Sequence, residues 1–344
     1  MEKVEGRILR VLSDTDEVDV VEGTLHIEDG VITEVTEEPV ASDDIVMPAF
    51  VNAHTHIGDS VAKEAGRGLS LDERVAPPDG LKHRILRDVT QEEKTDAMTK
   101  TVEFMRDSGT GAFVDFREGG AEGVESLRRA AEGTGVEAVA MGRGDPSVLD
   151  VADGYGASGT RDGDFGEPRR EARSLGKPFG IHAGERDADD IDDAFDLDPD
   201  FLVHMVHARD ADLEKLEDDE IPVAVCPRSN LVTDVGLPPV EDLVEHTDVA
   251  LGTDNVMLNS PSVWREMEFT SKLYDVSDDE VLRMATVNGG KLLGRDDLGV
   301  IEEGAEARLT VLGTSGELDG VRDAVAGVVR RAGAVDVRRV VVPS

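Results

Sequence analysis

The chain has 344 residues, 39% of them apolar, and a formal net charge of −39. Its nine lysines against 27 arginines show that lysine is avoided. An acidic excess of this size in a chain with enough apolar residues for a core predicts a folded protein with a densely acidic surface, adapted to concentrated salt. Such a surface repels nucleic acid and anionic membranes, so we expect neither as a partner.

Cys226 is the single cysteine, which excludes an intrachain disulfide and a metal site made of several cysteines. The N-terminal residues lack the basic and apolar regions of a signal peptide, and no stretch approaches 18 uninterrupted apolar residues. We therefore expect a cytoplasmic protein. Its length suits one large α/β barrel with a small accessory domain, or two mid-sized domains.

Both ends of the chain are predicted to be rich in β-strands. Near the N-terminus the candidate strands are residues 8–12, 24–27 and 31–35. Near the C-terminus they are residues 309–312, 326–330 and 335–342. We expect these strands to form one composite domain, a small β-sandwich built from residues 1–47 and 296–344.

Strand-like runs alternate with charged helical stretches through residues 48–295, as in a parallel α/β fold. The eight runs are residues 46–53, 111–116, 136–141, 154–158, 178–182, 201–206, 222–226 and 249–252. Helical patterns lie between most of them, at residues 92–107, 120–131, 168–175 and 210–218. One connection, residues 145–153, is too short for a full helix. This alternation predicts a TIM-like (β/α)₈ barrel, with a doubly wound open sheet as the alternative.

Polar residues able to bind a metal follow the apolar runs. His54 and His56 end the first run, and side chains at i and i+2 of a strand point to the same face. His182 ends a later run, Asp254 follows the last run, and the run between them offers both His204 and His207, between which periodicity does not decide. The barrel is favoured over the open sheet because such barrels place their active sites at the carboxyl ends of the strands.

The chemistry of these side chains is coherent. Neutral imidazoles and a carboxylate suit Zn²⁺ and leave a position for water, whose pKa falls from about 15.7 to about 7 on coordination. Asp254 and Glu185 supply two carboxylates, one to take the proton of that water and one to protonate a leaving group. Glu185 follows His182 by three residues, so we expect it in the loop, reaching over the pocket.

These motifs together resemble the amidohydrolase superfamily, in the branch of cytosine deaminase, guanine deaminase, triazine hydrolase and S-adenosylhomocysteine deaminase-like enzymes. The resemblance covers nearly the whole chain. It is carried by Pro-Ala-Phe-Val-Asn-Ala-His-Thr-His at 48–56 and by residues 182–185, 203–207, 226–230, 252–255 and 285–294.

The resemblance implies a role for each polar residue. Metal ligation is implied for His54, His56, His182 and Asp254. His204 would polarise the metal-bound water or the substrate, Asp254 would also take the water's proton, and Glu185 would shuttle a proton to a ring nitrogen. Metal-bound hydroxide would then attack the amine-bearing carbon of a heterocycle, and ammonia would leave.

The number of metals follows from a missing residue type. Two-metal relatives carry a bridging carboxylated lysine after strand four, whereas this chain has no lysine between Lys100 and Lys177. We therefore expect one divalent metal per chain, zinc first, with iron and manganese as alternatives. The resemblance also suggests a homodimer.

Substrate contacts are predicted from residues at strand ends or in the long first loop. An arginine fork suits a carboxylate, a phosphate or a ring carbonyl, and a tryptophan could stack on a heterocycle. The candidates are Arg143, Arg228, Arg117, His83 and Trp264.

The leading hypothesis is an aminohydrolase that acts on C–N bonds other than peptide bonds, in a nucleobase, nucleoside derivative, pterin or triazine. Hydrolysis of a cyclic amide or a ring halide at the same site is the alternative, and the acid Glu185 tilts the choice to deamination. A catalytically silent scaffold is the third hypothesis, against which the complete set of polar residues argues.

Overall fold

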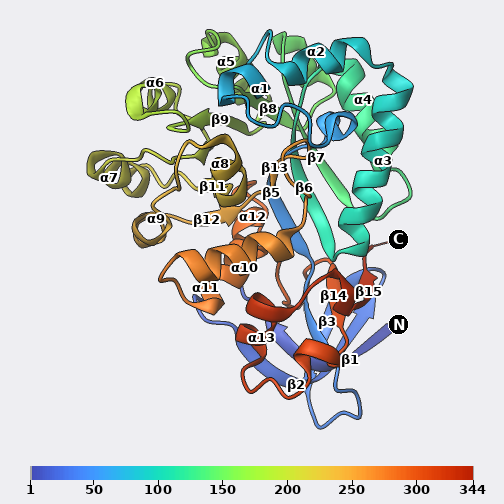
Figure 1. The fold of residues 1–344 in the computed structure, drawn as a ribbon. Coiled ribbons are helices and arrows are strands. Elements are labelled where there is room, and N and C mark those ends of the chain that lie inside the picture. The colour runs from blue at the N-terminus through green and yellow to red at the C-terminus, as the bar shows by residue number, and fades with distance from the viewer. Residues whose placement is uncertain (1, 344) are drawn as a thin grey trace.

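The computed structural model describes residues 2–343. Its strands form two sheets, a nine-stranded parallel sheet in the middle of the chain and a six-stranded mixed sheet from the two ends. Figure 1 shows the parallel sheet at the centre with helices around it, and the second sheet below it, where both termini lie. Within residues 2–343 none of the helices combines the length and the apolar character needed to cross a membrane.

Parallel pairing joins each strand of the central sheet to its neighbours. The strands are β5 (Phe50–His56), β6 (Thr110–Arg117), β7 (Glu137–Gly142), β8 (Gly154–Ala157), β9 (Phe179–Ala183), β10 (Phe201–His204), β11 (Val223–Val225), β12 (Val249–Leu251) and β13 (Asp254–Asn255). They overlap all eight predicted runs. Their side chains are almost entirely buried, as expected for parallel strands covered on both faces.

The last strand is broken in two, and its second half closes the sheet. β12 pairs with β11, whereas β13 pairs with β5, with Asp254 opposite Thr55. Between the two halves, the backbone N–H of Thr253 donates to the carbonyl of His54 at 3.0 Å. The sheet therefore curls back on itself, which is consistent with the predicted (β/α)₈ barrel and not with an open sheet.

Four helices fall where the sequence predicts them: α3 (Gln91–Asp107), α4 (Gly120–Ala131), α5 (Gly166–Leu175) and α7 (Asp210–Asp218). Between and after the barrel strands the structure also has α6 (Ile191–Asp196), α8 (Pro227–Thr233), α9 (Val240–His246), α10 (Val263–Leu273), α11 (Asp278–Met284) and α12 (Val287–Lys291). α3 begins at a capping box, in which Thr90 and Glu93 satisfy each other's backbone N–H groups. The short connection 145–153 holds only the 3₁₀ turn η2 (Pro146–Asp150), as expected.

A long segment between β5 and α3 reaches the carboxyl ends of the barrel strands. It contains η1 (Ile57–Ala62), α1 (Leu71–Val75) and α2 (Leu81–Asp88). Leu71, Val75 and Lys82 of this segment line the same pocket as His56 and His182. The segment therefore supplies one wall of the candidate site.

The terminal sheet has the strand order β15-β14-β4-β1-β2-β3. Its strands are β1 (Glu2–Arg10), β2 (Asp19–Glu28), β3 (Val31–Glu37), β4 (Ile45–Pro48), β14 (Leu309–Leu312) and β15 (Val337–Val341). The ends of the chain thus meet in a single six-stranded sheet, where the sequence predicted a β-sandwich. The domain limits, 1–47 with 296–344 and 48–295, stay a prediction.

Two predicted strands need correction. Residues 326–330 lie in a helix, α13 (Ala324–Arg331), which packs against α10 and α11. Its buried residues Val325, Val328 and Val329 follow helical spacing, and a short apolar run does not distinguish a buried strand from a helix. The predicted run 46–53 is divided, because β4 joins the terminal sheet and β5 begins the barrel.

Substitution of Gly252 by alanine tests the closure of the barrel. A Cβ atom at this position would lie 2.7 Å from Cβ of His54 and 3.0 Å from Sγ of Cys226, both in the buried core. We expect the free energy of unfolding to fall by about 1–3 kcal/mol, as overpacking does elsewhere. Urea unfolding at constant high KCl, followed by the fluorescence of Trp264, measures it.

Gly163→Ala is the matched control, since the nearest atom to its Cβ would be a Phe165 ring carbon at 3.7 Å. Equal unfolding midpoints for the two variants would show that closure of the barrel does not require a residue without a side chain at position 252.

Candidate metal centre

The six polar residues predicted from the strand ends lie together at the carboxyl end of the barrel. His54 and His56 come from β5, His182 from β9, His204 from β10 and Asp254 from β13. Glu185 follows β9 by two residues. Three overlapping groups have ligand atoms within 4.8 Å of one another: His54 with His56 and Asp254, His54 with His182 and His204, and Glu185 with His204 and Asp254. Metal ligation by these residues stays a prediction.

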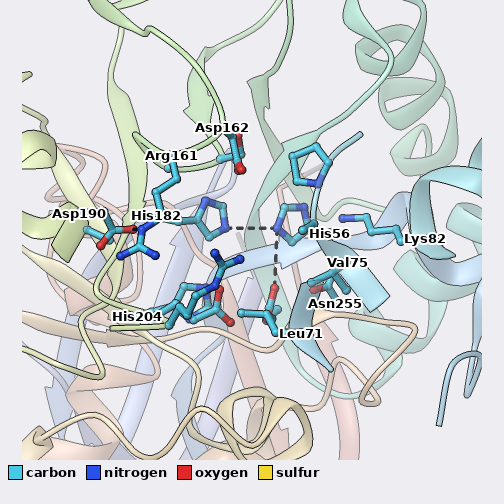
Figure 2. Close-up of a pocket in the computed structure, with 18 of the residues that line it drawn as sticks. His56, Leu71, Val75, Lys82, Arg161, Asp162, His182, Asp190, His204 and Asn255 are labelled. Carbon is cyan, nitrogen blue, oxygen red and sulfur yellow. Dashed lines mark hydrogen bonds and ion pairs between the residues drawn. The ribbon is translucent and has the colours of Figure 1, made fainter. Parts of the chain in front are cut away.

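The inner nitrogens of the histidines face one another and a carboxylate. Nε2 of His56 lies 3.4 Å from Nε2 of His182 and 3.7 Å from Oδ1 of Asp254. Nε2 of His54 lies 3.5 Å from the same carboxylate oxygen. Figure 2 shows the rings of His56 and His182 pointing toward each other across the pocket. Converging nitrogen lone pairs repel one another unless a cation lies among them.

The outer ring nitrogens are fixed by backbone carbonyls. Nδ1 of His56 donates to the carbonyl of Phe116 at 3.0 Å, and Nδ1 of His182 donates to that of Ala157 at 2.8 Å. In a neutral ring this leaves the lone pair on the inner Nε2, the arrangement common to metal-binding histidines. Both ring nitrogens of His54 are buried without a hydrogen-bond partner among the described residues, which indicates a missing ligand.

Burial sets the charge of this group. It lowers the pKa of His54, lowers that of His56 to about 3 and holds that of His182 well below its usual range, so all three rings are neutral. Burial alone would raise the pKa of Asp254, but the close approach of His54, 3.5 Å away, and of the other nearby histidines holds this pKa well below its ordinary value. Three neutral imidazoles and one carboxylate fit a zinc-type ion.

The backbone is strained where two of these side chains enter the pocket. His204 has a φ of 80° and Asp254 a φ of 57°, both in the left-handed region that residues other than glycine rarely adopt. Such conformations cost on the order of 1–3 kcal/mol and persist where neighbouring contacts enforce them. Here the N–H of Met205 donates to the carbonyl of Ala183 at 3.0 Å, and Ser229 Oγ donates to Asp254 at 2.5 Å. Strain at adjacent residues of one pocket indicates a functional site.

Glu185 and His204 form the side of the pocket opposite the β5 histidines. The side-chain amide of Asn230 donates to Nδ1 of His204 at 3.2 Å, which places the proton of the neutral ring on Nε2. That nitrogen lies 3.7 Å from Oε2 of Glu185. Burial raises the pKa of Glu185. The site therefore contains one carboxyl group with a raised pKa and one, Asp254, with a lowered pKa.

An open pocket with about 740 Å³ of empty space, part of it shared with solvent, leads to these residues. Both signs of charge line it. The acidic side chains are Asp162, Glu185, Asp190 and Asp254, and the basic side chains are Lys82, Arg143, Arg161 and Arg186. The cationic groups are noteworthy in a chain with a net charge of −39.

Arg143 is the one predicted substrate contact that lines this pocket. Arg117 is buried in ion pairs with Asp115 at 3.3 Å and Glu118 at 2.6 Å, behind the pocket wall. Arg228 points to the buried carboxylate of Glu266, at 2.8 Å. Neither guanidinium is directed at the site, because each neutralises a buried carboxylate.

His83 and Trp264 also lie outside the pocket lining. Nε2 of His83 contacts the carbonyl of Val75 at 3.1 Å, and burial lowers the pKa of this histidine to about 4. Trp264 is buried, packs edge-on against Phe50 with ring centroids 4.5 Å apart, and donates its indole N–H to the carbonyl of Ser108 at 2.7 Å. Trp264 therefore belongs to the buried core, and His83 links α2 to the end of α1.

Several lining residues escape sequence analysis. Arg161, Asp162 and Arg186 belong to loops without any periodic pattern, and Asp190 ends the short 3₁₀ turn η3 (Ala188–Asp190). Lys82 lies in the short helix α2, where a lysine reads as a solvated side chain, yet only 2% of it is exposed. The scarcity of lysine in this chain was the one available indication that Lys82 has a specific role.

Comparison with known proteins places the chain in a family. The model of the amidohydrolase family matches residues 45–150 and 165–342. An uncharacterized protein of Methanocaldococcus jannaschii is 35% identical over 92% of both chains. The 5-methylthioadenosine/S-adenosylhomocysteine deaminase of Haloarcula marismortui is 29% identical over 80% of this chain and 74% of its own length.

The fold is also shared with a solved enzyme. The adenosine deaminase of Xanthomonas campestris, crystallised with bound zinc, has a TM-score of 0.83 at 20% identity, covering 99% of this chain and 91% of that chain. The matches over nearly the whole sequence and the agreement in fold lead to one conclusion. The chain is a hydrolase of the amidohydrolase family.

Proposed function

We propose that the protein is a metal-dependent aminohydrolase that replaces an amino group on a nitrogen heterocycle by oxygen and releases ammonia. The observation that carries the proposal is the pair Glu185 and Asp254. Their oxygens lie within 4.8 Å of each other and of His204, and their environments move their pKa values in opposite directions. Two carboxyl groups at one site whose pKa values are moved in opposite directions are suited to acid and base roles in the same reaction.

The residues present fit one divalent metal, with zinc as the first choice. His54, His56, His182 and Asp254 would hold it, since their donor atoms converge and the two nitrogens of His54 have no other partner. When bound, the ion lowers the pKa of a coordinated water toward 7 and so supplies a nucleophile at neutral pH.

The protein's own groups account for the proton movements. Asp254, ionised, accepts a proton from the attacking water. Glu185, protonated, gives its proton to a ring nitrogen beside the amine-bearing carbon, and His204 donates an N–H from Nε2 to the oxygen that adds to this carbon. The tetrahedral carbon then loses its amino group, which takes the proton held by Asp254 and leaves as ammonia. The hydroxyl proton passes to Glu185, which restores its starting state, and the ring keeps a carbonyl oxygen.

Relatives support this choice of reaction. The Haloarcula protein is named as a deaminase, and the Xanthomonas structure is an adenosine deaminase. Hydrolysis of a ring halide would use the same water and Asp254, but halide leaves without taking a proton, whereas an amino group must be protonated to leave as ammonia. Glu185 therefore favours deamination over halide release, and the deaminase-named relatives favour it over hydrolysis of a cyclic amide.

Ammonia release should depend on both carboxyl groups. Zinc-loaded protein in molar KCl is incubated with amino-purines, amino-pyrimidines, pterins and S-adenosylhomocysteine-type nucleosides, and ammonia is measured. We expect release by the wild type, and a loss of at least about 10²-fold in kcat for Glu185→Gln and Asp254→Asn, the size of a lost acid or base.

Asn tolerates the left-handed backbone at position 254, so Asp254→Asn removes the charge without adding strain. Melting curves equal to that of the wild type would show that both variants are folded. Ammonia release that survives both substitutions would refute the proposed roles, and release of halide or ring opening in place of ammonia would establish the alternative chemistry.

Metal affinity should depend on the buried histidines. His182→Ala removes one of the converging nitrogens. Loss of a residue that only hydrogen-bonds to a metal ligand lowers metal affinity by roughly 10- to 100-fold, and we expect loss of His182 to lower zinc affinity by more. Calorimetric titration of zinc into metal-stripped protein measures affinity and number of sites. His246→Ala, at the end of the outer helix α9, is the control. Equal affinities for the two variants would exclude His182 as a ligand.

A further inference from the structure

The pocket wall next to His56 is cationic. Lys82, from α2, and Arg143, which directly follows β7, both line the pocket. The side chain of Lys82 is 3% exposed, and that of Arg143 is 15% exposed. In Figure 2 the amino group of Lys82 points toward His56, on the side away from His182. Burial of two cations side by side requires a compensating group.

Glu118 is that group, but it is shared among three cations. Its Oε1 lies 2.5 Å from Nζ of Lys82 and 3.5 Å from Nη1 of Arg143, and its Oε2 lies 2.6 Å from Nη2 of Arg117. Arg117 is also paired with Asp115 at 3.3 Å. These five side chains carry three positive charges against two negative charges, and Asp162, which lines the same pocket, interacts electrostatically with Arg143. The charge of Lys82 is therefore the one compensated by the shared Glu118.

Asp59 is a further buried carboxyl group that interacts with Lys82. Its oxygens already accept hydrogen bonds from the Asn255 side chain at 2.8 Å and the Met257 backbone at 3.0 Å. Burial raises the pKa of Asp59 to about 7, although Lys82 lowers it, so Asp59 is only partly ionised near neutral pH. It therefore offsets only part of the positive charge of Lys82.

Lys82 also has donors to spare. An ammonium group has three N–H donors, and within residues 2–343 the single ion pair that Lys82 makes is with Glu118. A buried donor without an acceptor costs free energy, more so when it is charged. An acceptor brought by a ligand would satisfy Lys82 at the point where the pocket meets His56.

We infer that Lys82, with Arg143 beside it, binds an electron-rich oxygen of the substrate, so that the substrate is an amino-heterocycle that also carries a ring carbonyl or a carboxylate. This inference rests on the proposed function and narrows its substrate class. The ring would lie between Glu185 on one side and Lys82 on the other, with its amine-bearing carbon near the converging histidines. A ring with amino groups alone, such as that of 5′-deoxyadenosine, offers no oxygen to this wall.

Kinetics of the zinc-loaded enzyme in molar KCl test the inference. Guanine and cytosine carry a ring carbonyl, an aminopyrimidine carboxylate carries the acid instead, and adenine and 5′-deoxyadenosine carry neither on the ring. For whichever oxygen-bearing class the wild type prefers, we expect Lys82→Met to raise KM by about 10- to 100-fold, with a smaller change in kcat, as for loss of a charged hydrogen bond used in binding. For the amino-only compounds, KM and kcat of Lys82→Met should stay within about twofold of the wild-type values.

Two further variants guard against a simple folding defect. Lys82→Arg keeps the cation and is expected to recover most of the lost affinity. Lys100→Met removes an equal charge from an exposed position on α3 and should behave as the wild type. Equal losses for oxygen-bearing and amino-only compounds in Lys82→Met, or a wild-type preference for the amino-only compounds, would overturn the inference.

Direct binding separates this inference from the proposed function. Xanthine and uracil carry ring carbonyl groups and no amino group. They are titrated calorimetrically into zinc-loaded wild type and Lys82→Met. Binding that depends on Lys82 without ammonia release from any compound would support the inference and overturn the deaminase proposal. Ammonia release that is unaffected by Lys82→Met would do the reverse. Absence of both binding and release would overturn the two together.

Discussion

Parallel pairing of Asp254 with Thr55 joins the last barrel strand to the first, and the candidate site depends on this contact. It places a carboxylate from residue 254 beside His54 and His56, which lie some two hundred positions earlier in the chain. The strand can make this pairing because it is broken at Gly252 and Thr253, where a side chain on Gly252 would meet His54. A regular eighth strand would continue past β11 and carry Asp254 away from the pocket. The contact that closes the barrel therefore also places Asp254 in the candidate site.

Burial gives the converging residues their chemistry. In water the three histidines would be partly protonated near pH 6.5 and would repel a metal ion. Inside the barrel, desolvation keeps them neutral, and carbonyls of the neighbouring strands β6 and β8 orient the rings of His56 and His182. The same low-polarity surroundings raise the pKa of Glu185, which has no cation among its hydrogen-bond partners in the described chain. One physical effect thus prepares both a neutral ligand set and a proton donor.

Sequence reasoning located the groups whose position is fixed by strands and failed for those fixed by neighbours. An apolar run followed by a polar residue predicts that this residue lies at the carboxyl end of a barrel strand. The structure accordingly brings His54, His182 and Asp254 together at one end of the barrel. The direction of a long side chain after the strand end is not contained in such a run. Arg117 and Arg228 turn to the buried acids Glu118 and Glu266, which no local pattern connects to them.

Salt screens the charges of the protein surface more strongly than the buried charges of the pocket. The net charge of −39 would repel an oxygen-rich, acidic substrate in dilute buffer, but in molar salt the screening length is only about 3 Å. Solvent ions then cancel the field of the surface carboxylates before it reaches an approaching ligand. The ammonium of Lys82, a buried residue of α2 in the pocket wall, is screened far less because it is shielded from solvent ions. Concentrated salt would therefore suppress the repulsion outside while leaving an attraction inside, which is how a strongly acidic protein could bind substrate through the proposed contact with Lys82.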